Sequence, residues 1–323
     1  MTTIDVVIAT HNRPERLLRC LDALAKQTHL RFGTIVVDDG SEPAMEGFIA
    51  GRRPGIANFT LLRTDRNSGP ARARNLGVSA SSADVICFID DDVDADEHLL
   101  ERHLAQVGDG TGRVVSIGPL LAPADWRPSP WNRWEADMLL AQYEKMGRGV
   151  FEASFRQFYT GNAALSRCDF VGAGGFDDRF TRAEDIELGI RLGRSGCRFA
   201  FDPEAIGWHY AHRSLSSWLN IPRQYARFDR AIDALYPEIA WLQNLEEERA
   251  QRNLLARVAG RGFTRLHAGP AMARLAVAGA ATLSRLKAMR LATVALSLAF
   301  ELEYAHAARK LHASGAPALP AAS

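Results

Sequence analysis

The amino-acid sequence predicts an α/β fold, in which a mainly parallel central sheet is flanked by helices and followed by a C-terminal helical region. In the first half, short runs rich in β-branched residues alternate with helix-length segments, and parallel strands need such crossover segments between them. Hydrophobic residues make up 47% and charged residues 24% of the 323 residues, which is ordinary for a folded globular protein. The chain is therefore expected to bury a large core.

The first strand is expected at residues 4–10 (IDVVIAT), and a helix at residues 14–27 follows it. Proline is suited to the first turn of a helix, and the apolar residues of this segment recur at helical spacing. These residues are Pro14 and then Leu17, Leu18, Leu21 and Leu24. Further strands are expected at residues 32–41, 59–64 and 84–92, with a helix at residues 69–80.

The second half is less regular. After residue 108 the alternation loosens into a stretch rich in Pro and Trp, and order resumes with a helix at residues 183–196 and a strand, turn and strand at residues 197–210. Beyond residue 231 the chain reads as helical, either as two packed helices or as a hairpin covering a hydrophobic patch. Its uncharged runs of ten residues are shorter than the roughly 18 residues of a membrane span.

We expect two domains, one over residues 1–230 and a basic helical extension with a frayed end over residues 231–323. The net charge of +1 argues against a nucleic-acid-binding protein. Residues 251–323 nevertheless hold ten Lys or Arg and only two acids. Because such residues attract anionic lipid headgroups, peripheral contact with the inner face of the cell membrane is an open alternative. Binding to a partner or formation of a homo-oligomer explains the basic region equally well.

The four cysteines are scattered without metal-type spacing, and no signal-peptide pattern opens the chain. A cytoplasmic location is therefore expected.

A run of aspartates, Asp90, Asp91 and Asp92, directly follows an apolar strand. In an extended chain Asp90 and Asp92 would face one side and Asp91 the other. Two carboxylates on one side suit Mg²⁺ or Mn²⁺, which complete their ligand shell with waters and substrate phosphates. A solvated acidic turn is the alternative, and it describes Asp94 or Asp96 as caps of the next helix.

Two further clusters have both a structural and a functional interpretation. Asp38 and Asp39 end a buried strand, where they would stabilise a turn or accept hydrogen bonds from a base or a ribose. Arg72, Arg74 and Asn75 would form a solvated helix face or compensate the charge of phosphates. A dinucleotide site of the Rossmann type is disfavoured because no GxGxxG motif follows the first strand.

Six segments appear in an order that resembles family 2 glycosyltransferases, which have the GT-A fold. These segments are VVIATHNRPERLLRCLDAL, VVDDGS, NSGPARARNLG, CFIDDD, TGNAALSR and AEDIELGIRL, and the resemblance covers about residues 4–230. It implies an inverting, metal-dependent transfer of a sugar from a UDP-, GDP- or dTDP-linked donor to a glycan or lipid-linked acceptor. The implied cofactor is a divalent cation, Mg²⁺ or Mn²⁺.

The resemblance also implies roles for single residues. Asp185 would be the general base, with Glu184 as its acidic neighbour. The acid pair has another interpretation, as simple enrichment of acids at a helix N-terminus. The residues expected to bind the donor are Thr10, Asn12, Asp38, Asp39, Arg72, Arg74, Asn75, Asp90 and Asp91.

Asp90 and Asp92 would form the metal-binding pair, with Asp92 as the direct ligand, and His209 would complete the site. A lone histidine is also common as a structural residue. The sugar and acceptor pocket would be formed by Gly161, Asn162 and Trp131. Trp131 lies in a tryptophan-rich stretch whose rings would stack on sugars or pack in the core.

Other functions fit the sequence less well. The segment QYARF has Phe228 where the QxxRW motif of processive relatives has Trp, which favours nonprocessive addition of single sugars. A nucleotidyltransferase should carry a glycine-rich loop near the first strand, and ATHNRPER has none. A noncatalytic sugar-nucleotide-binding protein would not need both Asp92 and Asp185.

Overall fold

The computed structural model describes residues 2–50, 55–109, 111–251, 269–314 and 319. The chain divides into two compact units. The first consists of Met1–Trp126 and Ala136–Ala211, and the second of Arg127–Glu135 and His212–Ser323. The boundary between the two units thus falls near residue 211, before the predicted domain boundary at residue 230. Which residues make up the catalytic domain stays a prediction.

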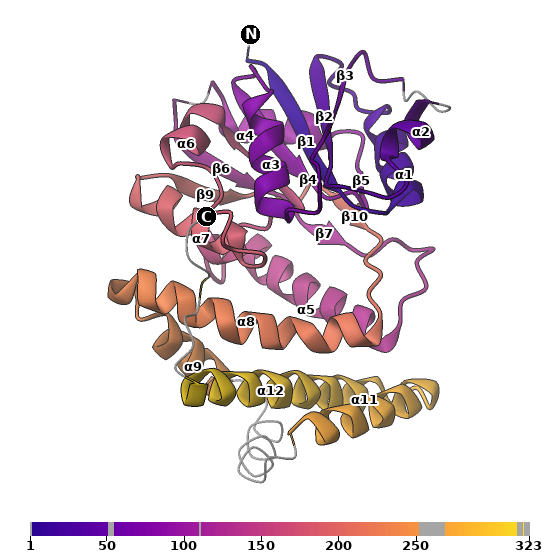
Figure 1. The fold of residues 1–323 in the computed structure, drawn as a ribbon, viewed down its shortest axis with the longest axis vertical. Coiled ribbons are helices and arrows are strands. Elements are labelled where there is room, and N and C mark those ends of the chain that lie inside the picture. Colours follow the sequence, from indigo (N-terminus) through magenta and orange to yellow (C-terminus); the bar gives the residue numbers. More distant parts are fainter. Residues whose placement is uncertain (1, 51–54, 110, 252–268, 315–318, 320–323) are drawn as a thin grey trace. The chain divides into compact units, whose positions relative to one another are not determined.

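The first unit is built on a seven-stranded sheet with the order β3-β2-β1-β4-β8-β6-β9 (Figure 1). Strands β3, β2, β1 and β4 are parallel, β8 is antiparallel to β4 and β6, and β9 is parallel to β6. The strands are β1 (Ile4–Thr10), β2 (Phe32–Asp38), β3 (Asn58–Arg63), β4 (Val85–Ile89), β6 (Val114–Ile117), β8 (Asn162–Ser166) and β9 (Arg198–Phe201). The prediction of a mainly parallel central sheet is therefore confirmed.

A smaller sheet has the order β5-β10-β7, where β5 is Val93–Ala95, β10 is Gly207–His209 and β7 is Leu120–Leu121. β10 runs antiparallel to β5, with His209 opposite Val93. This pairing brings the end of β10 to the segment that follows β4.

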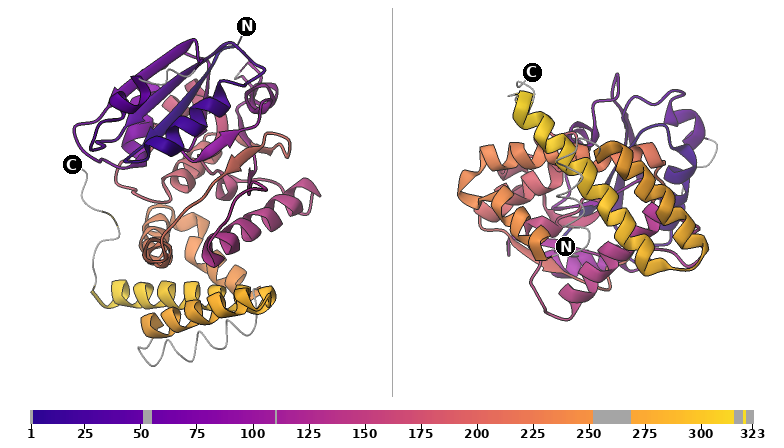
Figure 2. Two further views of the ribbon diagram at one scale, coloured as in Figure 1. Left: turned by 90° about the vertical axis from the view of Figure 1, so that its right-hand side faces the viewer. Right: turned by 90° about the horizontal axis from the view of Figure 1, so that it is seen from below.

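Helices cover both faces of the large sheet (Figures 1 and 2). Successive side chains of a strand point to opposite faces, so Val6 and Ile8 contribute to one apolar cluster and Val7 to the other. The helices of this unit are α1 (Pro14–Leu24), α2 (Met45–Ala50), α3 (Pro70–Ser79), α4 (Leu99–Val107), α6 (Arg167–Gly172) and α7 (Glu184–Arg194), with a 3₁₀ turn at Phe155–Gln157. α1, α2 and α4 contribute to the first cluster, and α3, α6 and α7 to the second.

Helix α5 (Pro130–Gly147) lies in the stretch that was expected to be irregular. That expectation was wrong because Pro130 stands at the start of the helix, where its missing N–H costs nothing. The helix begins in the second unit and continues in the first, where Tyr143 and Met146 are buried in the core.

The second unit is helical, as predicted. It contains α8 (Leu215–Leu235), a 3₁₀ turn at Pro237–Ile239, α9 (Trp241–Gln251), α11 (Gly269–Arg285) and α12 (Met289–Ser314). α11 and α12 are antiparallel and lie side by side (Figure 2). Their shared core contains the small residues Ala273, Ala280, Ala292 and Ala299, which let the two backbones approach closely. The two helices are packed together, and because a short turn joins them they form a hairpin, whose apolar side packs against α8.

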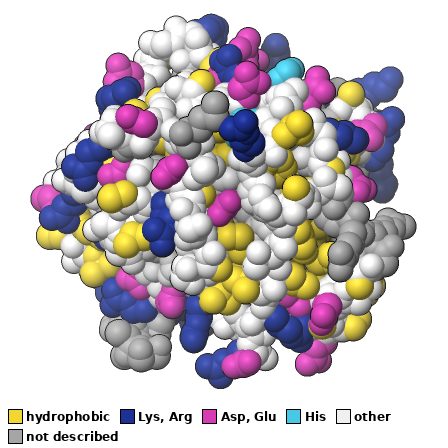
Figure 3. Space-filling model, turned by 90° about the horizontal axis from the view of Figure 1, so that it is seen from above, with side chains coloured by type: hydrophobic (Ala, Val, Ile, Leu, Met, Phe, Trp, Pro, Cys, Tyr) yellow, Lys and Arg dark blue, Asp and Glu magenta, His cyan; other side chains and the backbone are white. Residues whose placement is uncertain are grey.

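No helix within the described ranges is long and apolar enough to cross a membrane. The expected frayed end falls on residues 315–318 and 320–323, which lie outside the described residues. Figure 3 shows one face of the molecule, on which Lys and Arg side chains are interspersed with Asp and Glu. This mixture agrees with the small net charge of +1.

Two leucines of α12 test the importance of the helical core. Leu302 is fully buried, so Leu302→Ala should lower the free energy of unfolding by about 2–5 kcal/mol, the usual cost of a core cavity. Leu291 is exposed, so Leu291→Ala should change that free energy by less than about 0.5 kcal/mol. Urea unfolding followed by circular dichroism measures both, and equal effects would contradict the described packing.

Candidate active site

Three loops of the first unit meet at one edge of the large sheet. β1 ends at Thr10, which pairs with Asp38 at the end of β2, and β4 ends immediately before Asp90. The Thr10 hydroxyl donates a 2.7 Å hydrogen bond to Asp91 Oδ2 and so joins the end of β1 to the aspartate run. The carboxyl ends of β1, β2 and β4 therefore lie together at this edge of the sheet.

The aspartate run forms a turn rather than an extended strand. The Val93 N–H donates to the carbonyl oxygen of Asp90 at 3.1 Å. The alternation expected for Asp90, Asp91 and Asp92 was therefore wrong, because strand geometry ends at Ile89. Instead, the three carboxylates reach three different sets of partners.

The partners of the aspartate run are mainly arginines. Arg13, Arg16 and Arg19 follow one another at three-residue spacing, which places neighbouring side chains on one side of a helix. The ion pairs are Arg13–Asp91 (3.1 Å), Arg16–Asp92 (3.1 Å), Arg19–Asp94 (2.9 Å) and Arg74–Asp90 (2.7 Å). The sequence analysis did not identify these three arginines, although their spacing was a readable signal; Arg13 is the N-cap of α1, and Arg16 and Arg19 lie within it.

Asp92 and His209 form the pair that was expected at the metal site. His209 Nε2 lies 3.3 Å from Asp92 Oδ1, and the Tyr210 N–H donates to the Asp92 carbonyl at 3.0 Å. Burial alone would raise the pKa of the Asp92 carboxyl. The hydrogen bond and charge of His209, helped by nearby arginines, outweigh burial and hold that pKa well below its usual range. Asp92 is therefore ionised at neutral pH.

The Asp92 carboxylate and the His209 imidazole are both groups that bind divalent cations, and their nearest donor atoms lie 3.3 Å apart. Asp90 instead directs an oxygen at Arg74. Within the part of the chain that the structure describes, no group of three or more His, Cys, Asp or Glu is arranged to hold a metal.

Arg74 connects the aspartate turn to α7. Its guanidinium donates to Asp90 Oδ1 at 2.7 Å and to Glu184 Oε1 at 2.9 Å, and its side chain is buried. Arg74 is thus engaged with protein carboxylates, whereas Arg72 on the same helix is exposed. The two arginines predicted as donor-binding residues therefore lie in different environments.

Asp185 lies at the N-terminus of α7, directly after Ala183 and Glu184. Ala183 has the left-handed φ of 60°, an unusual conformation for a residue with a side chain. Burial, with the negative charge of neighbouring Glu184, raises the pKa of Asp185 to about 7. A carboxyl that exchanges its proton near neutral pH is suited to general base catalysis.

Asp38 and Asp39 stabilise the turn after β2. Asp38 accepts hydrogen bonds from the N–H groups of Ser41 and Met45, and its Oδ2 lies 2.6 Å from Arg63 Nη1. Asp39 accepts from the N–H of Gly69 at 2.8 Å at the start of α3, and from Ser68 and Thr64. The turn interpretation of this acid pair therefore describes the contacts that both carboxylates make.

Asn12 and Asn75 also hold the backbone in place. Asn12 has a left-handed φ of 55°, and its side-chain oxygen accepts from the Glu42 N–H at 2.8 Å. Asn75 donates to the Phe176 carbonyl at 2.8 Å and accepts from the Phe176 N–H at 2.9 Å. Both predicted donor-binding residues thus support the loops around the site.

Gly161 precedes β8 and Asn162 begins it, beside the aspartate turn. A Cβ on Gly161 would lie 2.9 Å from Asp90 Oδ2, so a side chain here would require the Asp90 carboxylate to move. The Asn162 amide donates to the carbonyls of Pro119 (2.9 Å) and Ala205 (2.7 Å). Asn162 is therefore buried and connects three segments of the first unit.

His103 was not identified from the sequence. It is fully buried and shares hydrogen bonds with Ser116 Oγ at 2.8 Å and Asn162 Oδ1 at 2.9 Å. Burial lowers the pKa of His103 to about 4, so the ring is neutral and orients the Asn162 amide. No sequence motif marks this residue, because its role depends on contacts between distant segments.

Trp131 belongs to the second unit and packs against the helical core. Its indole N–H donates to the Arg213 carbonyl at 2.9 Å. The core-packing interpretation of this residue accounts for these contacts.

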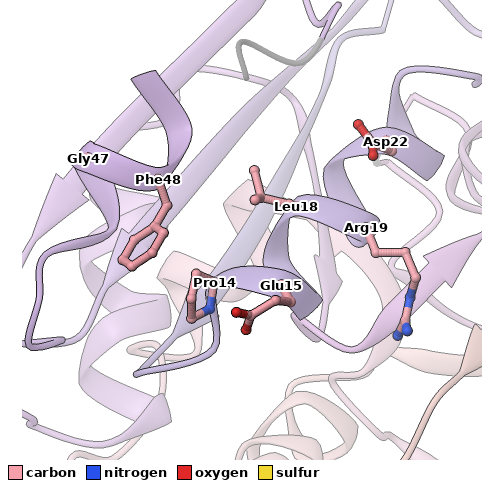
Figure 4. A pocket seen from close by; sticks show the side chains of 7 residues that line it. All are labelled: Pro14, Glu15, Leu18, Arg19, Asp22, Gly47 and Phe48. Carbon is pink, nitrogen blue, oxygen red and sulfur yellow. The ribbon is translucent and has the colours of Figure 1, made fainter. Parts of the chain in front are cut away.

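A cavity of about 520 Å³ lies between α1 and α2, lined by residues including Leu18 and Phe48 (Figure 4). None of the predicted site residues lines it. The aspartate turn, which combines ionised and titrating carboxyls with arginines and a histidine, is therefore the candidate active site.

The Arg74 bridge predicts a large difference between two neighbouring arginines. Arg74→Met should lower the free energy of unfolding by about 3–5 kcal/mol, because it leaves the buried Glu184 carboxylate without its partner. Arg72→Met removes an exposed guanidinium from the same helix and should cost less than about 0.5 kcal/mol. Denaturant unfolding of both variants checks this, and similar stabilities would exclude the bridge.

Several known proteins are similar to this chain. A pre-mycofactocin glycosyltransferase from Mycobacterium tuberculosis is 29% identical over 219 residues, covering 67% of this chain and 44% of that protein. A validoxylamine A glucosyltransferase from Streptomyces hygroscopicus subsp. jinggangensis is 28% identical, with coverage of 74% and 63%. The amylovoran biosynthesis glycosyltransferase AmsB from Erwinia amylovora is 25% identical, with coverage of 73% and 79%. The chain thus spans less than two thirds of the first two relatives.

The solved structure of S. aureus TarS 1–349 matches with a TM-score of 0.52 and 14% sequence identity. The match covers 98% of this chain and 92% of that one, and it supports the same fold.

The family model described as glycosyl transferase family 2 matches residues 5–170, about half of the chain. The matched segment contains Thr10, the aspartate turn and Asn162, and it ends before α7. This chain therefore belongs to glycosyltransferase family 2.

Proposed function

We propose that this protein is a nonprocessive inverting glycosyltransferase, which moves a sugar from a nucleoside-diphosphate sugar to a hydroxyl of a glycan or lipid-linked acceptor. The observation that carries the proposal is the chain of contacts from α7 to the aspartate turn. Asp185 titrates near neutrality beside Glu184, and Arg74 joins Glu184 to Asp90. A candidate base and a candidate diphosphate site thus belong to one connected network.

Inversion requires a single displacement at the anomeric carbon. The acceptor oxygen forms the new bond to that carbon as the bond to the diphosphate oxygen breaks, and the acceptor proton passes to the Asp185 carboxylate. Asp92 and His209 would hold the divalent cation, Mg²⁺ or Mn²⁺, which when bound offsets the charge of the departing diphosphate. The depressed pKa of Asp92 keeps that carboxylate ionised for this purpose.

Arg13 supports the same assignment of the diphosphate site. Its side chain is 47% exposed although it pairs with Asp91 at 3.1 Å. A guanidinium that is both anchored and accessible can accept a phosphate as a second partner, since it has five N–H donors. We infer that the diphosphate approaches the aspartate turn beside Arg13.

The names of several relatives support the proposed acceptor classes. They include a glucosyltransferase named for validoxylamine A, a protein of amylovoran biosynthesis, and a Haloferax volcanii glucuronosyltransferase named for glucosyl-dolichyl phosphate. The last of these names contains a sugar linked to a lipid phosphate. We propose UDP-, GDP- and dTDP-linked sugars as the donors to screen first.

Two substitutions separate binding from chemistry. Asp92→Ala should abolish the Mn²⁺-dependent thermal shift produced by a nucleotide sugar, because it removes the ionised metal ligand. Asp185→Asn should keep that shift but lose at least about a hundredfold in turnover, the usual contribution of a general base. Release of nucleoside diphosphate measures turnover, and Asp22→Asn, an exposed acid of α1, is the control. Near-normal turnover of either site variant would refute its assigned role.

The pH dependence of kcat/KM tests the base more directly. Because Asp185 must be deprotonated to accept a proton, the rate should rise with pH through about 7 and then level off. Glu184→Gln removes the neighbouring negative charge that helps to raise this pKa, so the rising limb should move to lower pH. An unchanged limb in Glu184→Gln would argue that another group controls the rate.

A further inference from the structure

The turn between α11 and α12 is a well-defined structure. α11 ends at Arg285 and α12 begins at Met289. The Lys287 N–H donates to the Ser284 carbonyl at 3.0 Å, and the Ala288 N–H to the Leu283 carbonyl at 2.9 Å, a pattern that usually ends helices at a glycine. Here Lys287 occupies the left-handed position, with φ 60°. The turn thus keeps a charged side chain where glycine would be less strained.

We call residues 285–291 (RLKAMRL) the hairpin tip. Its large apolar side chains are exposed: Leu286 by 72%, Leu291 by 59% and Met289 by 45%. In contrast, the core side of the same hairpin is made largely of alanines. The tip therefore presents its largest apolar residues to the outside of the unit.

Cations alternate with these apolar residues. Arg285, Lys287 and Arg290 are all exposed, and among the described residues none of them forms an ion pair. The sequence has no Asp or Glu between residues 249 and 300, so no acid close in sequence compensates this charge. The hairpin tip is thus both apolar and strongly positive.

We propose that the hairpin tip docks on the surface of an anionic lipid bilayer. The cations would lie among the lipid headgroups, and Leu286, Met289 and Leu291 would enter the boundary between headgroups and acyl chains. No described helix is long and apolar enough to cross a membrane, so the contact is peripheral. A convex turn needs no matching cavity to enter a fluid interface, and such a cavity would be needed on a protein partner.

A second copy of the chain is a less favourable occupant. A symmetric contact between two tips would bring Arg285, Lys287 and Arg290 close to the same cations of the other copy, and like charges across an interface are costly. An anionic bilayer supplies the opposite charge together with an apolar phase. This inference concerns the second unit alone and does not rest on the proposed transferase reaction.

Cosedimentation of the whole chain with vesicles tests the proposal. The protein should bind vesicles of phosphatidylcholine mixed with phosphatidylglycerol, and high salt should release it from them. It should not bind vesicles of pure phosphatidylcholine. Arg285→Gln with Arg290→Gln should weaken binding about thirtyfold, taking about 1 kcal/mol for each charge. Leu286→Ser with Leu291→Ser should weaken it at least about tenfold even in low salt, since insertion of the apolar side chains is lost.

Matched variants of the first unit serve as controls. Leu30 is 78% exposed, so Leu30→Ser removes an equally accessible leucine, and Lys145→Gln with Arg148→Gln removes two exposed cations. Both controls should bind vesicles like the unmodified chain. The proposal fails if the unmodified chain does not bind anionic vesicles or if the tip and control variants behave alike. It also fails if sedimentation equilibrium shows a dimer that Leu286→Ser with Leu291→Ser converts to a monomer.

Discussion

The neutralisation of the aspartates that follow β4 is the interaction on which the first unit depends. Asp91 and Asp92 are buried, and an uncompensated pair of charges about 4 Å apart would repel by about 4 kcal/mol even at an effective dielectric of about 20. Arg13 at the N-cap of α1 and Arg16 in its first turn compensate these charges. The core stripe of α1, which includes Leu17 and Leu21, lies next to its arginines. One short helix therefore covers the sheet and also offsets the charge repulsion within the aspartate turn.

The same arrangement gives chemically similar carboxyls different ionisation states. The pKa of Asp92 is depressed because His209 and the arginines together outweigh its burial. Burial raises the pKa of Asp91 to about 6, although the positive charge of Arg13 opposes this shift. Burial and the negative charge of Glu184 raise the pKa of Asp185 to about 7. One carboxyl that stays ionised and another that exchanges a proton near neutrality are what a metal ligand and a base require. Environment, rather than residue type, makes that distinction.

These effects show how far the sequence could lead. Buried β-branched runs predicted β1 and its neighbours, and the polar residues at the carboxyl edge of the sheet were predicted with them. The alternation expected for Asp90, Asp91 and Asp92 failed because it applies only inside a strand, and β4 ends at Ile89; the sequence offered the turn only as the alternative. The contacts of Asp39 with the start of α3 and of His103 with Asn162 join segments distant in sequence. No local pattern encodes them, so their geometry had to come from the fold.

The helical hairpin illustrates a different limit of sequence patterns. Its interior uses Ala273, Ala280 and Ala299, which contribute little to a hydrophobic pattern, so no clear amphipathic face was visible in the sequence. Close packing of small residues stabilises the hairpin through contact between the helices, whereas Leu286 and Leu291 remain exposed at its end. Leu296 and Leu302 of the same hairpin are buried, as large aliphatic side chains usually are, so the leucines at its end differ from them. The packing of the hairpin therefore does not explain why these leucines are exposed. Binding to something outside the second unit would explain it.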